Sequence, residues 1–141
     1  MNKINLGRVV LGGLLAGVVL NAFEILFNVV LFGKQMEAEL TRLHVPPVDS
    51  AFIVMATVLT FVLGIVIVLI YGLIRPRLGP GPKAAIVAAL IAWFGIYFYA
   101  GMFNMMIFRF PLNLTLIGFV WGIVEYVVAA LAGGWVYKEG D

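Results

Sequence analysis

Glu24 and Glu125 are the residues of this chain best suited to chemistry, because each places a carboxyl group within a long apolar segment. A carboxylate in hydrocarbon costs about 2.5–3.5 kcal/mol on insertion scales, so each should face the interior of a helical bundle and have a partner. No Lys or Arg is expected at their depth, and desolvation then favours the neutral acid. Three roles follow: a hydrogen bond between helices, a proton- or cation-binding site, or a contact with a ligand or partner subunit.

Other polar residues fall in the same half of the apolar segments. The spacing of Asn21, Glu24 and Asn28 puts them on one helical face. At about 1.5 Å per residue, Glu24 would lie about 12 Å and Glu125 about 19 Å below the outer boundary. Thr57, Thr60, Tyr99 and Asn104 would lie between about 8 and 15 Å below it. We therefore predict one interior polar cluster, made of Asn21, Glu24, Asn28, Thr57, Thr60, Tyr99, Asn104 and Glu125.

The available residue types argue against an enzyme. The chain has no cysteine, its one serine is Ser50, and its one histidine, His44, lies outside the apolar segments. The parts of serine, thiol and metal-centred catalysis are therefore missing, and we expect no catalytic residue, metal site or intrinsic cofactor. Met102 and Met106 have the spacing of a thioether pair for Cu(I), but we interpret them as packing residues. A bound lipid or other apolar molecule is compatible with the aromatic run from Trp93 to Tyr99.

Four apolar stretches must position these groups, and they cover residues 6–32, 51–74, 84–108 and 112–137. Each meets the ~20 helical residues that a bilayer requires. Hydrophobic residues make up 64% of the chain and charged residues 11%, whereas soluble domains carry about 25% charged residues. We predict a single all-α transmembrane domain over residues 1–141, an up-down-up-down four-helix bundle. A short amphipathic helix at 34–43 should lie on the outer membrane surface between the first two spans.

Small residues recur at four-residue spacing in every predicted span and indicate close helix packing. The expected packing positions are Gly13, Gly17, Ala56, Gly64, Ala88, Ala92, Gly118 and Gly122. Their pattern does not distinguish packing within the chain from packing against another subunit.

The basic residues indicate an orientation. Lys3, Arg8, Arg75, Arg77, Lys83 and Lys138 fall on one side of a four-span topology, and Lys34, Arg42 and Arg109 fall on the other. By the positive-inside rule both termini should face the cytoplasm, in a bacterial inner membrane. These bases form no continuous stripe, which argues against nucleic-acid binding. The expected partners are membrane lipids and other transmembrane subunits or copies of this chain.

Two resemblances bear on function. Four spans with an acid in the first are similar to the small multidrug resistance transporters, but Glu24 lies late in its span and the third span, with Ala84 to Ala92, lacks their glycine-rich pattern. The layout more closely resembles small four-helix bacterial membrane proteins, through the Leu31-Phe32-Gly33-Lys34 end of the first span, the Arg75-Pro76-Arg77 break and a last span rich in Gly, Trp and Tyr. This resemblance implies a fold and no particular activity. We expect an accessory or structural subunit, or a small homo-oligomer; the alternatives are a proton- or cation-coupled transporter and a lipid- or isoprenoid-binding protein.

Overall fold

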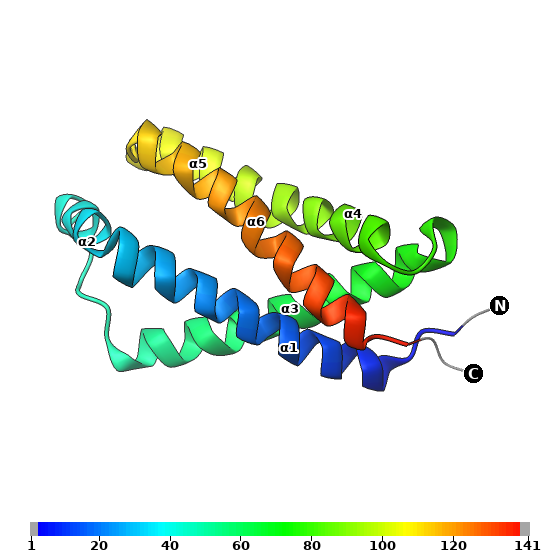
Figure 1. Cartoon of the computed structure of the whole chain (residues 1–141). Helices are drawn as coiled ribbons and strands as arrows, with labels where there is room; N and C mark the ends of the chain where they lie inside the picture. The colour runs from blue at the N-terminus through cyan, green and yellow to red at the C-terminus, as the bar shows by residue number, and fades with distance from the viewer. Residues whose placement is uncertain (1–2, 139–141) are drawn as a thin grey trace.

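The computed structural model describes residues 3–138, and these are almost entirely helical. In chain order the elements are α1 (Leu6–Ile25), η1 (Leu26–Leu31), α2 (Gly33–Arg42), α3 (Ser50–Leu78), α4 (Pro82–Ala92), η2 (Trp93–Phe98), α5 (Tyr99–Phe108) and α6 (Leu112–Val136). The elements η1 and η2 are π-helical turns that continue α1 into α2 and join α4 to α5 (Figure 1).

Four stretches of the described residues are long and apolar enough to cross a membrane, as the sequence predicts. They run over Leu6–Leu31, Ser50–Leu78, Pro82–Phe108 and Leu112–Val136. The helix starts follow from local chemistry: Asp49 caps α3 by accepting from the Phe52 N–H at 2.8 Å, and Pro82 lies in the first turn of α4. The all-helical class and the amphipathic segment before α3 agree with the sequence-based expectation.

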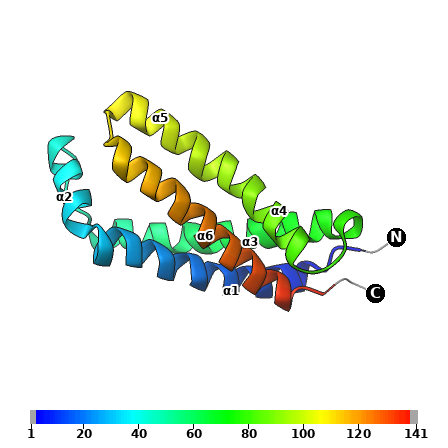
Figure 2. The same cartoon turned by 45° about the horizontal axis from the view of Figure 1, so that its top comes forward.

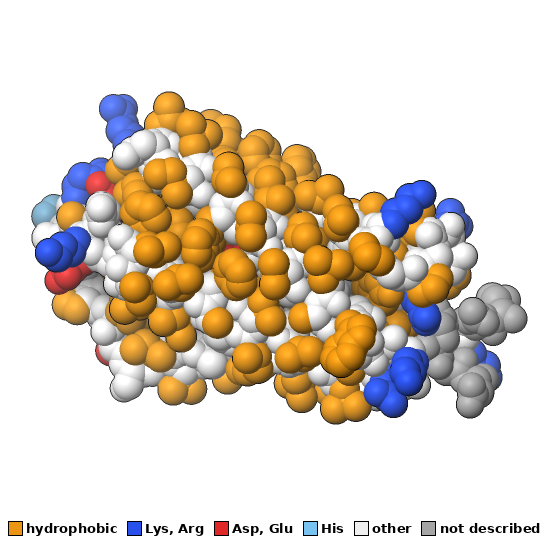
Figure 3. All heavy atoms as spheres, in the orientation of Figure 1, with side chains coloured by type: hydrophobic (Ala, Val, Ile, Leu, Met, Phe, Trp, Pro, Cys, Tyr) orange, Lys and Arg blue, Asp and Glu red, His pale blue; other side chains and the backbone are white. Residues whose placement is uncertain are grey.

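Both described ends of the chain lie at one end of an elongated molecule, together with the connection between α3 and α4 (Figures 1 and 2). We call this the terminal end, and we call the opposite end, which carries α2 and the α5–α6 connection, the hairpin end. α1 packs against α3 and α6, and α4 packs against the same two helices from the other side. Apolar side chains cover the middle of the molecule and basic groups lie at both ends (Figure 3).

The core lies toward the terminal end. Ala16, Val68, Ala88, Ala129 and Ala130 are fully buried there. By contrast, α5 has no buried residue. In the first half of α3, the large apolar side chains between Phe52 and Leu59 are exposed. Toward the hairpin end, α1, α3 and the paired α5 and α6 splay apart, as Figure 1 also shows.

The end of the second span and the presence of π-helical turns differ from the sequence-based expectation. The second span does not end at Ile74, because α3 continues through Pro76 to Leu78 and stops at Gly79, whose φ is 82°. A proline in the last turn removes one hydrogen bond without breaking the helix, so Pro76 does not act as the predicted terminator. The π-helical turns were not expected, because residue spacing alone carries no signal for the i→i+5 hydrogen bond from the Phe32 N–H to the Phe27 carbonyl at 3.0 Å.

The small-residue positions pack within the chain. A Cβ on Gly64 would meet the Gly13 carbonyl and would lie 2.6 Å from the Gly17 backbone nitrogen. A Cβ on Gly122 would lie 3.0 Å from three ring atoms of Tyr97. Six other predicted positions divide as follows: Gly13, Gly17, Ala88, Ala92 and Gly118 are buried, and Ala56 is partly exposed. The close approach of α1 to α3 is thus a contact inside one subunit.

Candidate functional site

The two acids predicted to face inward do meet in the structure. Glu125 of α6 is 1% exposed, Glu24 of α1 is partly buried, and the two carboxyl groups lie close enough to interact electrostatically. Two ionised carboxylates can only accept hydrogen bonds and repel each other in apolar surroundings, so a proton or a cation between them would stabilise the pair. We call these two residues the carboxyl pair.

The hydrogen-bond partners of the carboxyl pair are unequal. The Asn28 side-chain amide donates to Glu24 Oε2 at 3.0 Å and to the Glu24 carbonyl at 3.0 Å. Glu125 Oε2 is buried and has no hydrogen-bond partner among the described residues. A buried polar atom without a partner is uncommon in native proteins, because it has lost its water without a replacement. Glu125 therefore presents an acceptor that a bound proton, cation or water molecule would satisfy.

Aromatic residues surround the carboxyl pair. Tyr97 and Tyr126 stand edge to face with ring centroids 5.7 Å apart, and both lie close to the two acids. The Trp121 ring of α6 lies 5.4 Å from the Phe23 ring of α1 and 5.6 Å from the Phe27 ring of η1. Apolar rings of this kind lower the local dielectric constant, which strengthens electrostatic interactions.

Both π-helical turns adjoin the carboxyl pair. η1 begins two residues after Glu24 and contains Asn28, whereas η2 contains Tyr97. A π turn widens the helix and shifts the residues beyond it around the axis, and such turns occur frequently at functional sites. The glycines Gly118 and Gly122 of α6 leave space for the Tyr97 ring. The site therefore lies where η1 interrupts regular α geometry after α1 and where η2 interrupts it between α4 and α5.

The remaining members of the predicted polar cluster do not bond to the carboxyl pair. The Asn21 side chain donates to the Gly17 carbonyl, and the Thr57 and Thr60 hydroxyls donate to the carbonyls of Ile53 and Ala56 in their own helix. Tyr99 is 57% exposed and Asn104 is also exposed on α5. Depth along a helix does not determine the face on which a side chain lies.

Tyr97, Tyr126 and Trp121 are neighbours of the pair that the predicted cluster does not include. Tyr97 belongs to the aromatic run considered for an apolar ligand, and its four-residue relation to Trp93 gave no hint of an acid partner. Trp121 and Glu125 lie four residues apart on α6, so a search for polar atoms on the Glu125 face would have found Trp121. Tyr126 is adjacent to Glu125 in sequence and is 3% exposed.

Access to the carboxyl pair differs between the two ends of the molecule. Toward the terminal end, α1, α3 and α6 pack through Ala16, Val68 and Ala129, which are fully buried and apolar. Toward the hairpin end, Glu24 is partly exposed and bonds to the partly exposed Asn28. The partly exposed polar groups nearest Glu125 therefore lie on its hairpin side.

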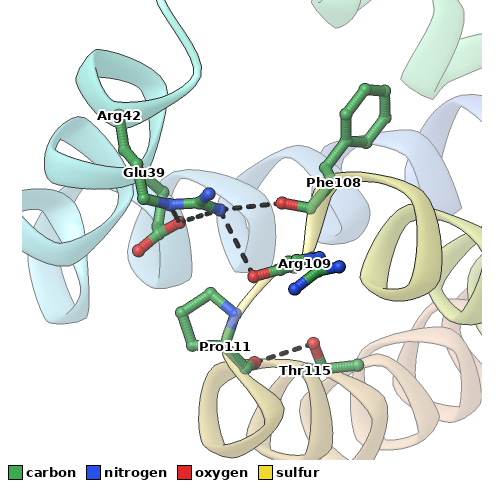
Figure 4. A network of polar contacts seen from close by, with 6 residues as sticks. All are labelled: Glu39, Arg42, Phe108, Arg109, Pro111 and Thr115. Carbon is green, nitrogen blue, oxygen red and sulfur yellow. Dashed lines mark hydrogen bonds and ion pairs between the residues drawn. The ribbon is translucent and has the colours of Figure 1, made fainter.

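A separate polar network joins the elements at the hairpin end. Arg42 of α2 bonds to Glu39 at 2.7 Å and donates to the carbonyls of Phe108 at 2.9 Å and Arg109 at 3.3 Å (Figure 4). Arg109 has a left-handed φ of 53°, which ends α5. This network attaches α2 to the α5–α6 connection, so α2 has a partner in the chain at its C-terminal end.

The structure offers a limited set of ligand groups. Among the described residues, no group of three or more His, Asp or Glu side chains is arranged to hold a metal ion.

Comparisons with protein-family models, with curated proteins and with solved structures found no match to this chain.

Proposed function

We propose that this chain is a non-enzymatic integral membrane protein and a small proton- or cation-coupled transporter. The observation that carries the proposal is the carboxyl pair, in which Glu24 and Glu125 share a site within apolar helices and Glu125 Oε2 lacks a partner. A role in helix packing alone would be expected to satisfy that oxygen. Ionisable groups within membrane-spanning helices commonly mark ion and proton routes.

The orientation proposed for the protein follows from its charges. The four apolar helices would cross the membrane in alternate directions, with both termini in the cytoplasm of a bacterial cell. Six basic residues support this, since Lys3, Arg8, Arg75, Arg77, Lys83 and Lys138 all belong to the terminal end. The hairpin end would face outward, and there Lys34, Arg42 and Arg109 are balanced by Glu37, Glu39 and Asp49.

In the proposed mechanism, the carboxyl pair always holds at least one positive charge between its oxygens. Two like charges at this separation repel strongly in a medium of low dielectric constant, so loss of the shared proton requires a cation in its place. The proton or cation would enter and leave the carboxyl pair from the hairpin end, past Asn28 and Glu24. Release on the terminal side would require the packing of Ala16, Val68 and Ala129 to open, and the splayed hairpin end would close in return.

Proton flux in liposomes tests this proposal. The purified protein is reconstituted with a pH-sensitive dye inside, a membrane potential is imposed, and flux is measured with Na⁺, with K⁺ and with neither. We expect flux above that of empty liposomes, and we expect Glu24→Gln and Glu125→Gln to abolish it while the variants stay folded. Glu37→Gln, an exposed acid of α2, is the matched control and should retain full flux. Equal flux in wild type and both pair variants would refute the proposal.

A second candidate function, an accessory subunit or homo-oligomer, has one observation in its favour. The first half of α3 exposes Phe52, Val54, Met55 and Leu59 by 60 to 66%, with a shallow apolar surface along it. However, the small-residue faces that first suggested association pack inside the chain, as Gly64 against Gly13 illustrates. Mass measurement in mild detergent tests this alternative, since a strictly monomeric species without partners would contradict it.

A further inference from the structure

An apolar groove of about 560 Å³ opens at the terminal end, away from the carboxyl pair. Its walls come from α4 and α6, which diverge toward this end in Figure 1, and its floor includes Tyr71 of α3. The residues that matter here are Ala85 of α4 and Val128, Leu131 and Ala132 of α6. The volume falls within the ~300–1,000 Å³ range of small-molecule sites, and its lining is almost wholly apolar.

The groove runs lengthwise along α6. Val128 and Trp135 both line it, and seven residues of α-helix separate them by about 10.5 Å. At one extremity lies Pro82 at the start of α4, and there the Gly81 N–H donates to the Tyr71 hydroxyl at 3.1 Å. Trp135 is 83% exposed at the same extremity. An exposed tryptophan beside an apolar slot is typical of the depth at which lipid headgroups lie.

Basic residues that lie near groove-lining residues in the sequence indicate the headgroup that the groove would accept. Lys83 follows Pro82 directly and Lys138 lies three residues after Trp135; both are exposed, and neither lines the groove itself. Among the residues that the structure describes, the terminal end carries six basic side chains and no acidic one. Counting Glu139 and Asp141, which lie outside the described residues, the sequence still gives this side six bases against two acids.

From this juxtaposition we propose that the groove is a binding site for an anionic glycerophospholipid. One acyl chain lies between α4 and α6, and the phosphate contacts Lys83 and Lys138. Basic residues beside grooves between membrane helices bind anionic headgroups on the cytoplasmic side of membrane proteins. The inference requires membrane insertion but does not depend on the carboxyl pair, so flux measurements and lipid binding can fail independently.

Native mass spectrometry tests the headgroup preference. The protein in detergent is titrated with phosphatidylglycerol and, separately, with phosphatidylcholine of the same chains. We expect one phosphatidylglycerol molecule to be retained preferentially, and we expect Lys83→Gln with Lys138→Gln to weaken its binding about 25-fold, at roughly five-fold per lysine. Lys34→Gln at the hairpin end is the charge-matched control and should have no effect. Equal retention of the two lipids, or an unchanged double variant, would overturn the proposal.

A second pair of variants tests the place of the acyl chain. Ala132→Phe fills the groove and should reduce retention of both lipids at least ten-fold. Val120→Phe adds a similar side chain at a position of α6 that is 64% exposed and outside the groove, and it should bind as the wild type does. Circular dichroism and a gel-filtration profile establish that both variants are folded. Undiminished lipid retention by folded Ala132→Phe would contradict the assignment.

Discussion

Replacing Gly64 with alanine tests whether the close approach of α1 and α3 organises the bundle. The added Cβ would meet the Gly13 carbonyl and lie 2.6 Å from the Gly17 nitrogen, whereas ordinary contact begins at 3.4 Å. Both neighbours are backbone atoms in a helix and cannot rotate away. The two helices must therefore separate by at least about 0.8 Å, the difference between those two distances, because the Gly13 carbonyl is nearer still.

The magnitude follows from that separation. A gap of 0.5–1 Å forfeits a quarter to a half of each van der Waals contact along the interface. Overpacking of this kind costs about 1–3 kcal/mol, and the better helix propensity of alanine offsets about 1 kcal/mol of it. We expect Gly64→Ala to lower the free energy of unfolding by up to about 2 kcal/mol.

Gly95→Ala is the matched control, because a Cβ at Gly95 meets no atom within 4 Å. It should raise the free energy of unfolding by about 0.5–1 kcal/mol through helix propensity alone. Titration of the protein in mild-detergent micelles with sodium dodecyl sulfate, followed by circular dichroism, measures both values. If Gly64→Ala proved as stable as Gly95→Ala, the steric account of the α1–α3 contact would be wrong.

Three further predictions concern stability. Glu125→Leu leaves Glu24 without its partner in an apolar site. The double variant Glu24→Leu with Glu125→Leu should therefore be about 1 kcal/mol more stable than Glu125→Leu alone, measured by the same detergent titration. A double variant less stable than both single variants would contradict this. Arg42→Gln removes the charged donor to the Phe108 and Arg109 carbonyls and should accelerate amide hydrogen exchange in the α5–α6 connection, while Lys34→Gln should not. Arg109→Gly should stabilise the protein by about 1 kcal/mol, because glycine adopts the φ of 53° without strain and the carbonyl that Arg42 binds is retained; a loss of stability would show that the arginine side chain itself holds the connection.

Much of the fold could be predicted from the sequence because hydrophobic length carries the information. The four apolar stretches, the capping residue Asp49 and the proline at the start of α4 all follow from strong local signals. The extension of α3 through Pro76 does not follow from such a signal, since a proline in the last turn removes one hydrogen bond and leaves the other bonds of the helix in place. The π-helical turns depend on tertiary packing, which local propensity does not describe.

The candidate site could be predicted in part. The free energy needed to bury a carboxyl group predicted that Glu24 and Glu125 face inward. The four-residue spacing predicted that Asn28 shares a helical face with Glu24, and its amide does donate to that carboxyl group. The hydroxyls of Thr57 and Thr60 instead bond within their own helix, a local solution open to any threonine in a helix. Tyr97 was assigned no polar neighbour, because its contact with α6 depends on the space that Gly118 and Gly122 leave.

The two π-helical turns also bear on how this chain tolerates a change in length. In a regular α-helix, one deleted residue rotates everything beyond it by about 100° and turns buried side chains outward. A π turn already contains one residue more than the α-helical path needs, so a deletion within Leu26–Leu31 or Trp93–Phe98 can be absorbed by a return to α geometry. Homologues that differ by a single residue inside a span should therefore carry their gaps at these two places, and a gap there would move Asn28 or Tyr97 relative to the acids.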